Sequence, residues 1–333
     1  MSEWRHYSPK VSVVVVTFNG RRFLFDCLTS IKETKYPAFE TILVDNGSRD
    51  GSSQYVKDNF PWVKVCYLDS NKGYTGGNNI GAKIAQGEFV VFLNNDVVVD
   101  PMWISELVKV AEGDSNIAAV CGYDIPMRFL GSKIDISRVV QTKESAIAGG
   151  CIWLVRKSVW NAIGPLREEF FCTWEEYEWS WRAFLRGYTI YSTPHSFVFH
   201  HGSGTSGIAK LLSSQVKEDW DNPYFYYFYR NEFLFYWYTL RLPYLVWPVL
   251  KWLLKFALNG IFRWNQYALR HMWKAWLYIF SNKCKLWRER KRALRSWILP
   301  DRKLWGLWRE QRKDWECLNR YYKAHEQKRN KSV

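Results

Sequence analysis

The sequence contains no CxxC pair, although it has seven cysteines spread along 333 residues. This spacing excludes a zinc ribbon and argues against a disulfide scaffold, so it favours a reducing compartment. No internal repeat and no low-complexity run is present, which argues against general disorder. The first ten residues lack the apolar segment of a secretory signal, and we therefore expect none.

A hydrophobic run that could cross a membrane is also missing, since such a run needs about 18 uncharged residues. In residues 220–333 the longest uncharged stretch has nine residues, 242–250, and it contains two prolines. Any membrane contact of this part would therefore be at the surface of the bilayer.

Basic and aromatic residues are abundant, and both are concentrated toward the C-terminus. The whole chain has a net charge of +15 and is 18% aromatic and 47% apolar, enough for a sizeable core. Residues 1–219 have a net charge of −1, whereas residues 220–333 have +16 and hold 12 of the 20 tryptophans. We therefore expect two regions with different roles, divided between residues 219 and 220.

The basic region favours a set of interfacial helices, because Trp and Tyr prefer the headgroup level and Lys and Arg attract anionic lipid. On one continuous helix, five cations would share an arc of about 140°: Lys251, Lys255, Arg263, Arg270 and Lys274. Gly260 could interrupt that helix. The alternatives are a solvated helical hairpin and, since no recognition motif accompanies the charge, less readily a nucleic-acid-binding surface.

In the first region short β-branched runs alternate with segments of helical spacing. The runs at 11–16, 41–45, 63–68 and 89–93 predict strands, and 22–34, 52–60 and 78–86 predict helices. Two more short strands are expected at 188–192 and 196–200, and a mobile loop at 202–207. Such alternation is typical of an α/β fold with a parallel sheet, which binds ligands beyond the carboxyl ends of its strands.

Polar residues stand at those strand ends. Thr17, Asp45 and Asp96 each follow or end an apolar run. Asp45 could accept the imide N–H of a uracil or thymine ring, or it could simply cap a turn. The Gly/Asn-rich segment 71–81 could approach a phosphorylated ligand, although it matches neither a dinucleotide fingerprint nor a P-loop.

Two further clusters could carry chemistry. Asp96 suits a hard divalent cation, and of His200 and His201 only one can reach the same site, because neighbours on a strand face opposite sides. Glu175, Glu176 and Glu178 crowd together beside tryptophans, which should raise at least one pKa toward that of a general base. The alternative for the glutamates is an acidic helix start with a Glu178–Arg182 pair.

The ordered set of segments resembles family 2 glycosyltransferases of the GT-A fold, especially the rhamnosyltransferase-like and galactofuranosyltransferase-like branches. The matching segments run from about residue 11 to 206: VVVVTFNG, ILVDNGSRDGS, NKGYTGGNNIG, FVVFLNNDV, GGCIWLVRKSVWNAIGPLREEFF, WEEYEWSWR and FHHGSGTS. The family's aromatic, basic C-terminal segment starts at an Arg-Asn pair, here Arg230-Asn231. The resemblance implies a Rossmann-like, mostly parallel sheet flanked by helices, with a membrane-associating helical region after it.

The resemblance also implies roles for individual residues. It places Glu176 as catalytic base with Glu175 beside it, Asp96 and His200 on a divalent metal (Mg²⁺ or Mn²⁺), and Glu178 and Arg182 in supporting positions. The nucleotide-sugar site would consist of Thr17, Asn19, Asp45, Asn71, Asn79 and Asn95. Two departures matter: the metal motif, Asn94-Asn95-Asp96, has one carboxylate fewer than usual, and Arg167 replaces a frequent Asp.

We therefore expect an inverting, metal-dependent transferase in cell-surface glycan synthesis that moves a rhamnose-like sugar. Its donor would carry UDP or dTDP rather than GDP, and its acceptor would be a saccharide or lipid-linked hydroxyl. The basic region would hold it peripherally on the cytoplasmic, anionic membrane face, with no nucleic acid involved. The alternative is a membrane- or nucleic-acid-binding protein with a non-catalytic nucleotide-sugar module.

Overall fold

The computed structural model describes residues 8–202, 223–261, 266–296 and 301–331. Among these residues a nine-stranded sheet has the order β3-β2-β1-β4-β8-β6-β9-β5, with β7 paired to β9. The strands are β1 (Val11–Thr17), β2 (Phe39–Asp45), β3 (Lys64–Tyr67), β4 (Phe89–Asn94), β5 (Val97–Val99), β6 (Ile117–Pro126), β7 (Lys143–Glu144), β8 (Ile152–Arg156) and β9 (Thr189–His200). The division expected at 219/220 and most of the loop expected at 202–207 lie outside the described residues.

The α/β architecture is confirmed, but only part of the sheet is parallel. Strands β3, β2, β1 and β4 run parallel, as the alternating pattern predicts. Strand β8 is antiparallel to both β4 and β6, and β5 and β7 are antiparallel to β9, while β6 and β9 are parallel. The expectation of a mostly parallel sheet is therefore correct for the first four strands and wrong for the second half of a mixed sheet.

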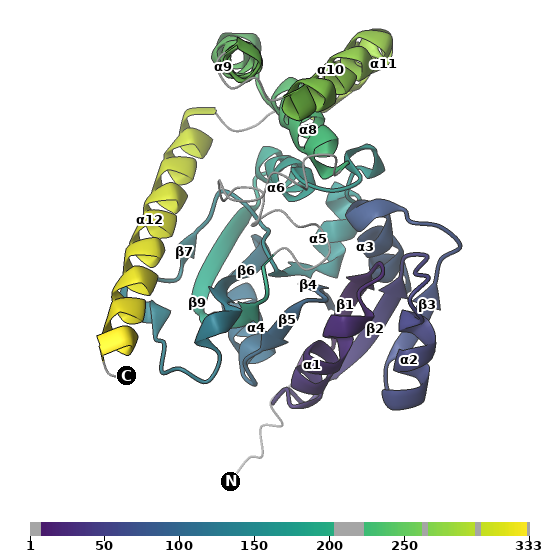
Figure 1. Ribbon diagram of the computed structural model, residues 1–333, viewed down its shortest axis with the longest axis vertical. Helices are drawn as coiled ribbons and strands as arrows, with labels where there is room; N and C mark the ends of the chain where they lie inside the picture. Colours follow the sequence, from purple (N-terminus) through teal and green to yellow (C-terminus); the bar gives the residue numbers. More distant parts are fainter. Residues whose placement is uncertain (1–7, 203–222, 262–265, 297–300, 332–333) are drawn as a thin grey trace.

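Helices cover both faces of the sheet (Figure 1), which explains why β1 is apolar on both sides. Val11, Val13 and Val15 pack toward one core with α1 (Arg21–Lys32), α2 (Ser52–Asn59) and α4 (Trp103–Glu112). Val14 packs into the other core, with α3 (Gly73–Ile84), α5 (Lys157–Ile163) and α6 (Glu175–Leu185). The site is built at the carboxyl edge between these layers.

Two local predictions are corrected. Helix α3 begins at Gly73, five residues before the predicted start, so residues 73–81 of the Gly/Asn-rich segment are helical. Residues 189–200 form one strand rather than two, although Pro194 interrupts the pattern. The β6–β9 register shifts between the Cys121–Ser192 and Tyr123–Phe197 pairs, so the proline falls where no regular ladder partner is required.

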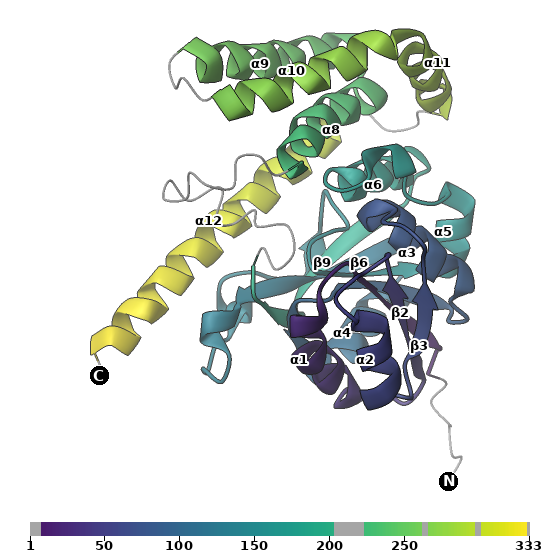
Figure 2. The same ribbon diagram turned by 45° about the vertical axis from the view of Figure 1, so that its right-hand side comes forward.

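The basic region is helical, with α8 (Tyr224–Thr239), α9 (Leu242–Ile261), α10 (Gln266–Ser281), α11 (Lys283–Ala293) and α12 (Asp301–Lys331). In Figure 2, α9 and α10 form a layer at the end of the molecule remote from the sheet, with α8 beneath them, while α12 runs back past β9. Helix α9 ends at Ile261, one residue after the Gly260 that could interrupt it, and α10 starts at Gln266, so the single-helix arc of five cations is wrong. Arg263 lies outside the described residues. Among the described residues, none of the helices combines the length and the apolar character that crossing a bilayer demands.

Candidate active site

The sheet brings the predicted strand-end residues together. In the β-ladder Thr17 lies opposite Asp45, and Val16 lies opposite Asn94. The Asn95 side chain amide donates a hydrogen bond of 2.9 Å to the Thr17 hydroxyl. Thr17, Asp45, Asn95 and Asp96 are all buried, so this edge presents a closely packed polar floor.

Asp45 anchors the loop that follows β2. Its Oδ1 accepts a 2.9 Å hydrogen bond from the Ser48 backbone N–H, and its Oδ2 accepts one from the Ser53 hydroxyl. Asn19, with φ +51°, joins this loop to the end of β1, because its Oδ1 accepts the Arg49 N–H at 2.8 Å. The turn-capping role of Asp45 is therefore present, and each oxygen keeps lone-pair capacity for a ligand.

The two other predicted asparagines use their amides within the protein. Asn71 Oδ1 accepts hydrogen bonds from the Asn46 amide at 3.0 Å and the Gly73 N–H at 2.8 Å. Asn79 donates to the Leu166 carbonyl and accepts from the Leu166 N–H, both at 2.9 Å. Asn71 therefore shapes the first turn of α3, and Asn79 fixes α3 to the segment that leads into α6.

Gly73, at the start of α3, lies against the loop that precedes the glutamates of α6. Its φ is +73°, and an added Cβ would lie 2.3 Å from the Phe171 carbonyl oxygen. The Thr75 N–H donates to that same carbonyl at 3.1 Å. The glycine-rich turn thus packs directly against the loop before α6, which a larger side chain at residue 73 would push away.

Asp96 and His200 lie side by side, as predicted. His200 Nε2 is 3.3 Å from Asp96 Oδ2. On the other edge of the ring, Nδ1 is 3.1 Å from Cys151 Sγ and 3.7 Å from Asp124 Oδ2. Asp124 and Cys151 are absent from the sequence predictions. Asp124 lies within β6, two residues before the strand ends at Pro126, so it does not stand at a strand end as Asp45 does.

This cluster fits a hard divalent cation. Asp124, Cys151 and His200 offer ligand atoms that all lie within 4.8 Å of one another, and Asp96 adds a second carboxylate beside the ring. Burial raises the pKa of Cys151 to about 12, so the group is a neutral thiol while no cation is bound. Burial alone would lower the pKa of His200, but hydrogen bonds with Asp124, Asp96 and Cys151 raise it to about 12. The two carboxylates therefore create a strong local preference for positive charge, which Mg²⁺ or Mn²⁺ would satisfy.

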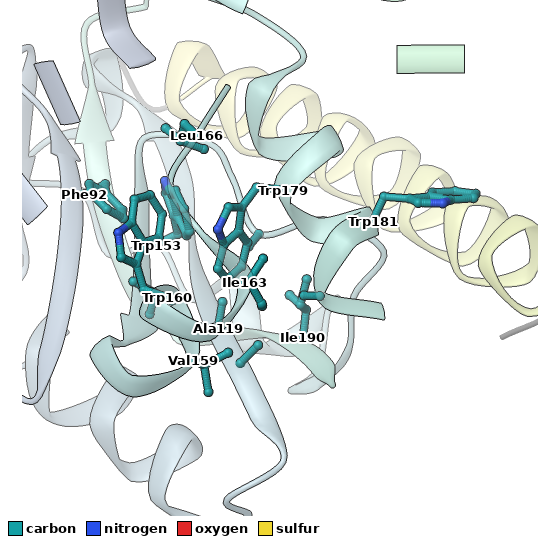
Figure 3. Packing of buried hydrophobic residues seen from close by; sticks show 14 of the residues in the cluster. Phe92, Ala119, Trp153, Val159, Trp160, Ile163, Leu166, Trp179, Trp181 and Ile190 are labelled. Carbon is teal, nitrogen blue, oxygen red and sulfur yellow. The ribbon is translucent and has the colours of Figure 1, made fainter. Parts of the chain in front are cut away.

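A tryptophan cluster holds α6 in place beneath the site (Figure 3). Trp153 on β8 and Trp160 on α5 flank Trp179 on α6, with ring centroids 5.4 Å and 5.6 Å from it. Trp181 points the opposite way in Figure 3 and packs on Phe235 of α8, at 5.8 Å. Large buried rings on both sides fix how far α6 stands from the sheet.

Glu178 organises the loop before α6. Its carboxylate accepts from Arg167 Nε at 2.7 Å and from Arg182 Nε at 3.0 Å. Burial opposes ionisation of Glu178, but these two cations lower its pKa below the ordinary value. Arg182 also donates to the carbonyls of Ile163, Gly164 and Pro165. The Glu178–Arg182 pair, which the alternative of an acidic helix start also predicts, is present, and Arg167, the departure from the family pattern, completes the network. A supporting role of this network in catalysis stays a prediction.

Glu175 and Glu176 have different surroundings from Glu178. Glu175 is buried, and its Oε2 has no hydrogen-bond partner among the described residues. Burial, together with the neighbouring Glu176, raises the pKa of Glu175 well above its ordinary value. Burial also raises the pKa of Glu176, to about 7, although the N–H groups of Glu176 and Gly150 favour its ionised form. The predicted elevation of at least one pKa is confirmed.

A short glycine segment connects Glu176 to the carboxylate–histidine cluster. An added Cβ on Gly149 would lie 3.1 Å from Glu176 Cβ, and the Gly150 N–H hydrogen-bonds the Glu176 carboxylate. The next residue is Cys151, whose Sγ contacts His200. The half-buried Glu176 therefore lies against residues 149–150, which lead directly into the Cys151–His200 contact.

Comparisons with known proteins place part of the chain in a family. Residues 12–160 match the family model described as glycosyl transferase family 2. EpsH of Bacillus subtilis (strain 168), named as a glycosyltransferase, is 27% identical over 235 residues, covering 63% of this chain and 66% of that protein. The O-antigen biosynthesis protein RfbC of Myxococcus xanthus is 28% identical over 228 residues, covering 60% of this chain but only 18% of its own length.

Solved structures of low identity share the fold. The mannosyltransferase PcManGT of Pyrobaculum calidifontis, solved with GDP-Man and Mn²⁺, has a TM-score of 0.54 at 18% identity, covering 83% of this chain and 76% of that one. S. aureus TarS 1–349 in complex with UDP has a TM-score of 0.51 at 18% identity, covering 90% and 83%.

The fold is the GT-A fold. Within it, residues 12–160 form a glycosyl transferase family 2 domain.

Proposed function

We propose that the protein is an inverting glycosyltransferase that uses a nucleoside-diphosphate sugar. The observation that carries this proposal is Glu176, a carboxylate whose pKa is raised to about 7 and which lies against Gly149 and Gly150, the two residues that precede the Cys151–His200 contact. A general base that works near neutral pH needs such a pKa. The family 2 domain and the polar strand ends supply the donor side of the same site.

In the proposed reaction, Glu176 takes the proton from an acceptor hydroxyl as its oxygen attacks the anomeric carbon. The bond from that carbon to the diphosphate breaks on the opposite face, so the configuration inverts and the nucleoside diphosphate leaves with the bonding electron pair. Asp96 and His200, with Asp124 nearby, would hold a divalent cation, which when bound supplies charge stabilisation to the leaving diphosphate. The backbone N–H of Gly150 would favour the ionised form of Glu176, which is the form that accepts the proton.

For the donor we infer UDP or dTDP rather than GDP, and a rhamnose-like sugar. The buried Asp45 carboxylate at the end of β2 supports uracil or thymine as the nucleobase of the donor, because it can accept the imide N–H of either ring. Among the structural relatives, TarS is solved with UDP and PcManGT with GDP-Man. The sugar rests on the sequence resemblance alone.

For the acceptor we infer a saccharide or lipid-linked hydroxyl in cell-surface glycan synthesis, with the enzyme peripheral on the cytoplasmic membrane face. The name of RfbC, an O-antigen biosynthesis protein, supports the pathway class. The net charge of +16 in residues 220–333 supports an anionic surface as partner. No nucleic acid is needed, because the acidic cluster at residues 175–178 has no role in binding phosphates of a polynucleotide.

A panel of nucleotide sugars tests the proposal, with thermal stabilisation measured in the presence and absence of Mn²⁺ or Mg²⁺. We expect one UDP or dTDP sugar to raise the melting temperature most, and only with the cation. Released nucleoside diphosphate in the presence of an acceptor should follow the same donor. Stabilisation without any transfer or donor hydrolysis would favour the alternative, a non-catalytic nucleotide-sugar-binding module.

A further inference from the structure

Helix α9 exposes an apolar face that no described residue covers. Besides Tyr244, seven large hydrophobic side chains of α9 are exposed among the described residues, and none has a polar group except the indole N–H of Trp247: Leu242, Val246, Trp247, Leu250, Leu253, Leu254 and Leu258. At about 100° per residue these seven positions span an arc of about 160°. Trp247 is 63% exposed. Soluble proteins rarely expose a contiguous apolar surface of this kind.

The opposite face of α9 packs against α8. Leu245 and Trp252 are buried, and the Trp252 indole N–H donates a 3.0 Å hydrogen bond to the Tyr229 carbonyl of α8. Helix α8 in turn packs on α6, where Phe235 contacts Trp181. The apolar face therefore points away from the catalytic domain, as the position of α9 at the far end of the molecule indicates (Figure 2).

Helix α10 continues this surface beside α9. Met272 and Ala275 are buried in a cluster with Phe225 and Tyr229 of α8. On the other side of the same helix, large apolar residues are exposed next to two exposed cations: Trp273, Trp276, Leu277 and Phe280, with Arg270 and Lys274. We refer to the exposed residues named on these two helices as the α9–α10 face.

The charges around this face are all of one sign. Residues 242–281 contain five Lys and Arg and no Asp or Glu. Lys251 Nζ lies 5.1 Å from the centre of the Trp247 ring, and Lys283 Nζ lies 4.7 Å from that of Phe280. Cations therefore lie beside exposed aromatic rings, a combination that is typical of side chains at the headgroup level of a membrane.

We propose that the α9–α10 face lies in the headgroup layer of an anionic membrane, with α9 parallel to the bilayer plane. The apolar arc would enter the acyl boundary, while Lys251, Arg270 and Lys274 would contact lipid phosphates. A second copy is a poor occupant, because its own α9–α10 face would bring like charges together without a counter-ion. This inference gives the membrane partner a defined surface and does not depend on which sugar is transferred.

Flotation of the full chain with vesicles tests the surface. We would compare phosphatidylcholine vesicles with vesicles that also contain phosphatidylglycerol. Trp247→Glu is expected to lower the vesicle-binding constant by about tenfold or more, because an indole that would insert into the membrane is replaced by a charge. Trp315→Glu is the matched control, because Trp315 is 51% exposed on α12, outside the face. Lys251→Ala and Lys274→Ala should each lower binding to the anionic vesicles by about fivefold.

Three results would overturn the proposal. These are absence of binding by the unaltered chain, equal losses in Trp247→Glu and Trp315→Glu, and a dimer in sedimentation velocity that Trp247→Glu converts to monomer. Donor hydrolysis, measured without vesicles, tests the proposed transferase activity separately from membrane binding. If Trp247→Glu floats poorly but turns over donor normally, the surface is supported, and a chain that floats but has no turnover contradicts only the sugar-transfer proposal.

Discussion

The two halves of the molecule are both rich in tryptophan, but their tryptophans have different neighbours. In the sheet domain Trp153 and Trp179 are completely buried and hold α6 beneath the site. In the C-terminal half Trp247 and Trp273 are exposed on the α9–α10 face. Aromatic content alone therefore does not distinguish a buried core from an exposed binding surface. The difference is whether the aromatic rings pack against another layer of the same protein.

Helix α8 belongs with the first half in this respect, although its sequence is as aromatic as that of α9. The Asn231 side chain amide donates to the carbonyls of Phe170, Cys172 and Thr173, at 2.7, 2.8 and 3.0 Å. Arg230 donates to the carbonyls of Glu169 and Phe170. The pair thus fixes the loop that carries three residues with positive φ, Phe171, Thr173 and Trp174, directly before Glu175.

The largest expected effect lies in the first half. Glu176→Gln should lower turnover by about 10²–10⁴-fold, because the amide cannot accept the acceptor proton. Donor affinity, measured by calorimetry with Mn²⁺ present, should be nearly unchanged. Glu316→Gln on the exposed surface of α12 is the control and should turn over normally. A Glu176→Gln protein with near-full activity would remove this residue from the proposed reaction.

Asn231→Leu tests whether α8 is part of the catalytic half. The Cys172 and Thr173 carbonyls would lose this donor at a position with 0% exposure, and the Phe170 carbonyl would keep only its other donors, so we expect the free energy of unfolding to fall by about 3 kcal/mol. The measurement is urea unfolding followed by tryptophan fluorescence.

Asn319→Leu, at an exposed position of α12, is the matched control and should change stability little. If both variants unfold alike, α8 is only loosely attached and the comparison between α8 and α9 fails.

Much of the sheet domain could be predicted because its signals are local. Strands β1, β2 and β4 are short β-branched or apolar runs that end in polar turns, and the order of the motifs identified Asp45, Asp96, Glu176 and His200. Asp124 and Cys151 were missed, since their contact with His200 depends on how β6, β8 and β9 lie side by side. Such pairing between distant segments leaves no periodic trace in the sequence.

The C-terminal half was less predictable for a related reason. The sequence places cations and aromatics in the region, but the break between α9 and α10 decides which of them share a face. A one-helix wheel therefore put Lys251 and Arg270 on one arc, whereas they belong to different helices. Burial of α8 was also hidden, because its partners, Phe170 to Thr173, lie in a loop without regular structure.

Asp124→Asn tests whether Asp124 positions the His200 ring in the candidate cation site. His200 can give only one ring nitrogen to a cation, and Asp124 lies 3.7 Å from Nδ1 while Asp96 lies 3.3 Å from Nε2. If Asp124 orients the ring, its loss should weaken Mn²⁺ binding by about 10–100-fold, as for other residues that position metal ligands.

Electron paramagnetic resonance of free Mn²⁺ measures this affinity without turnover. Asp58→Asn, an exposed change on α2, is the control. Unchanged Mn²⁺ affinity in Asp124→Asn would contradict the positioning role, and vesicle binding should be the same in all three proteins.

The pH dependence gives the smallest and most discriminating effect. The pKa of Glu176 is raised from 4.5 to about 7, and only its ionised form accepts a proton. The rate should therefore rise about tenfold from pH 6 to pH 8, with an apparent pKa that belongs to the Glu175–Glu176 pair. Because the folded state holds this proton more tightly, the raised pKa favours folding at low pH, and that contribution is lost as pH rises from about 4.5 through 7.

Lysine and arginine ordinarily keep their charge between pH 6 and 8, so vesicle binding should stay constant over the pH range in which turnover rises. A parallel rise of both would mean that the two halves do not act separately.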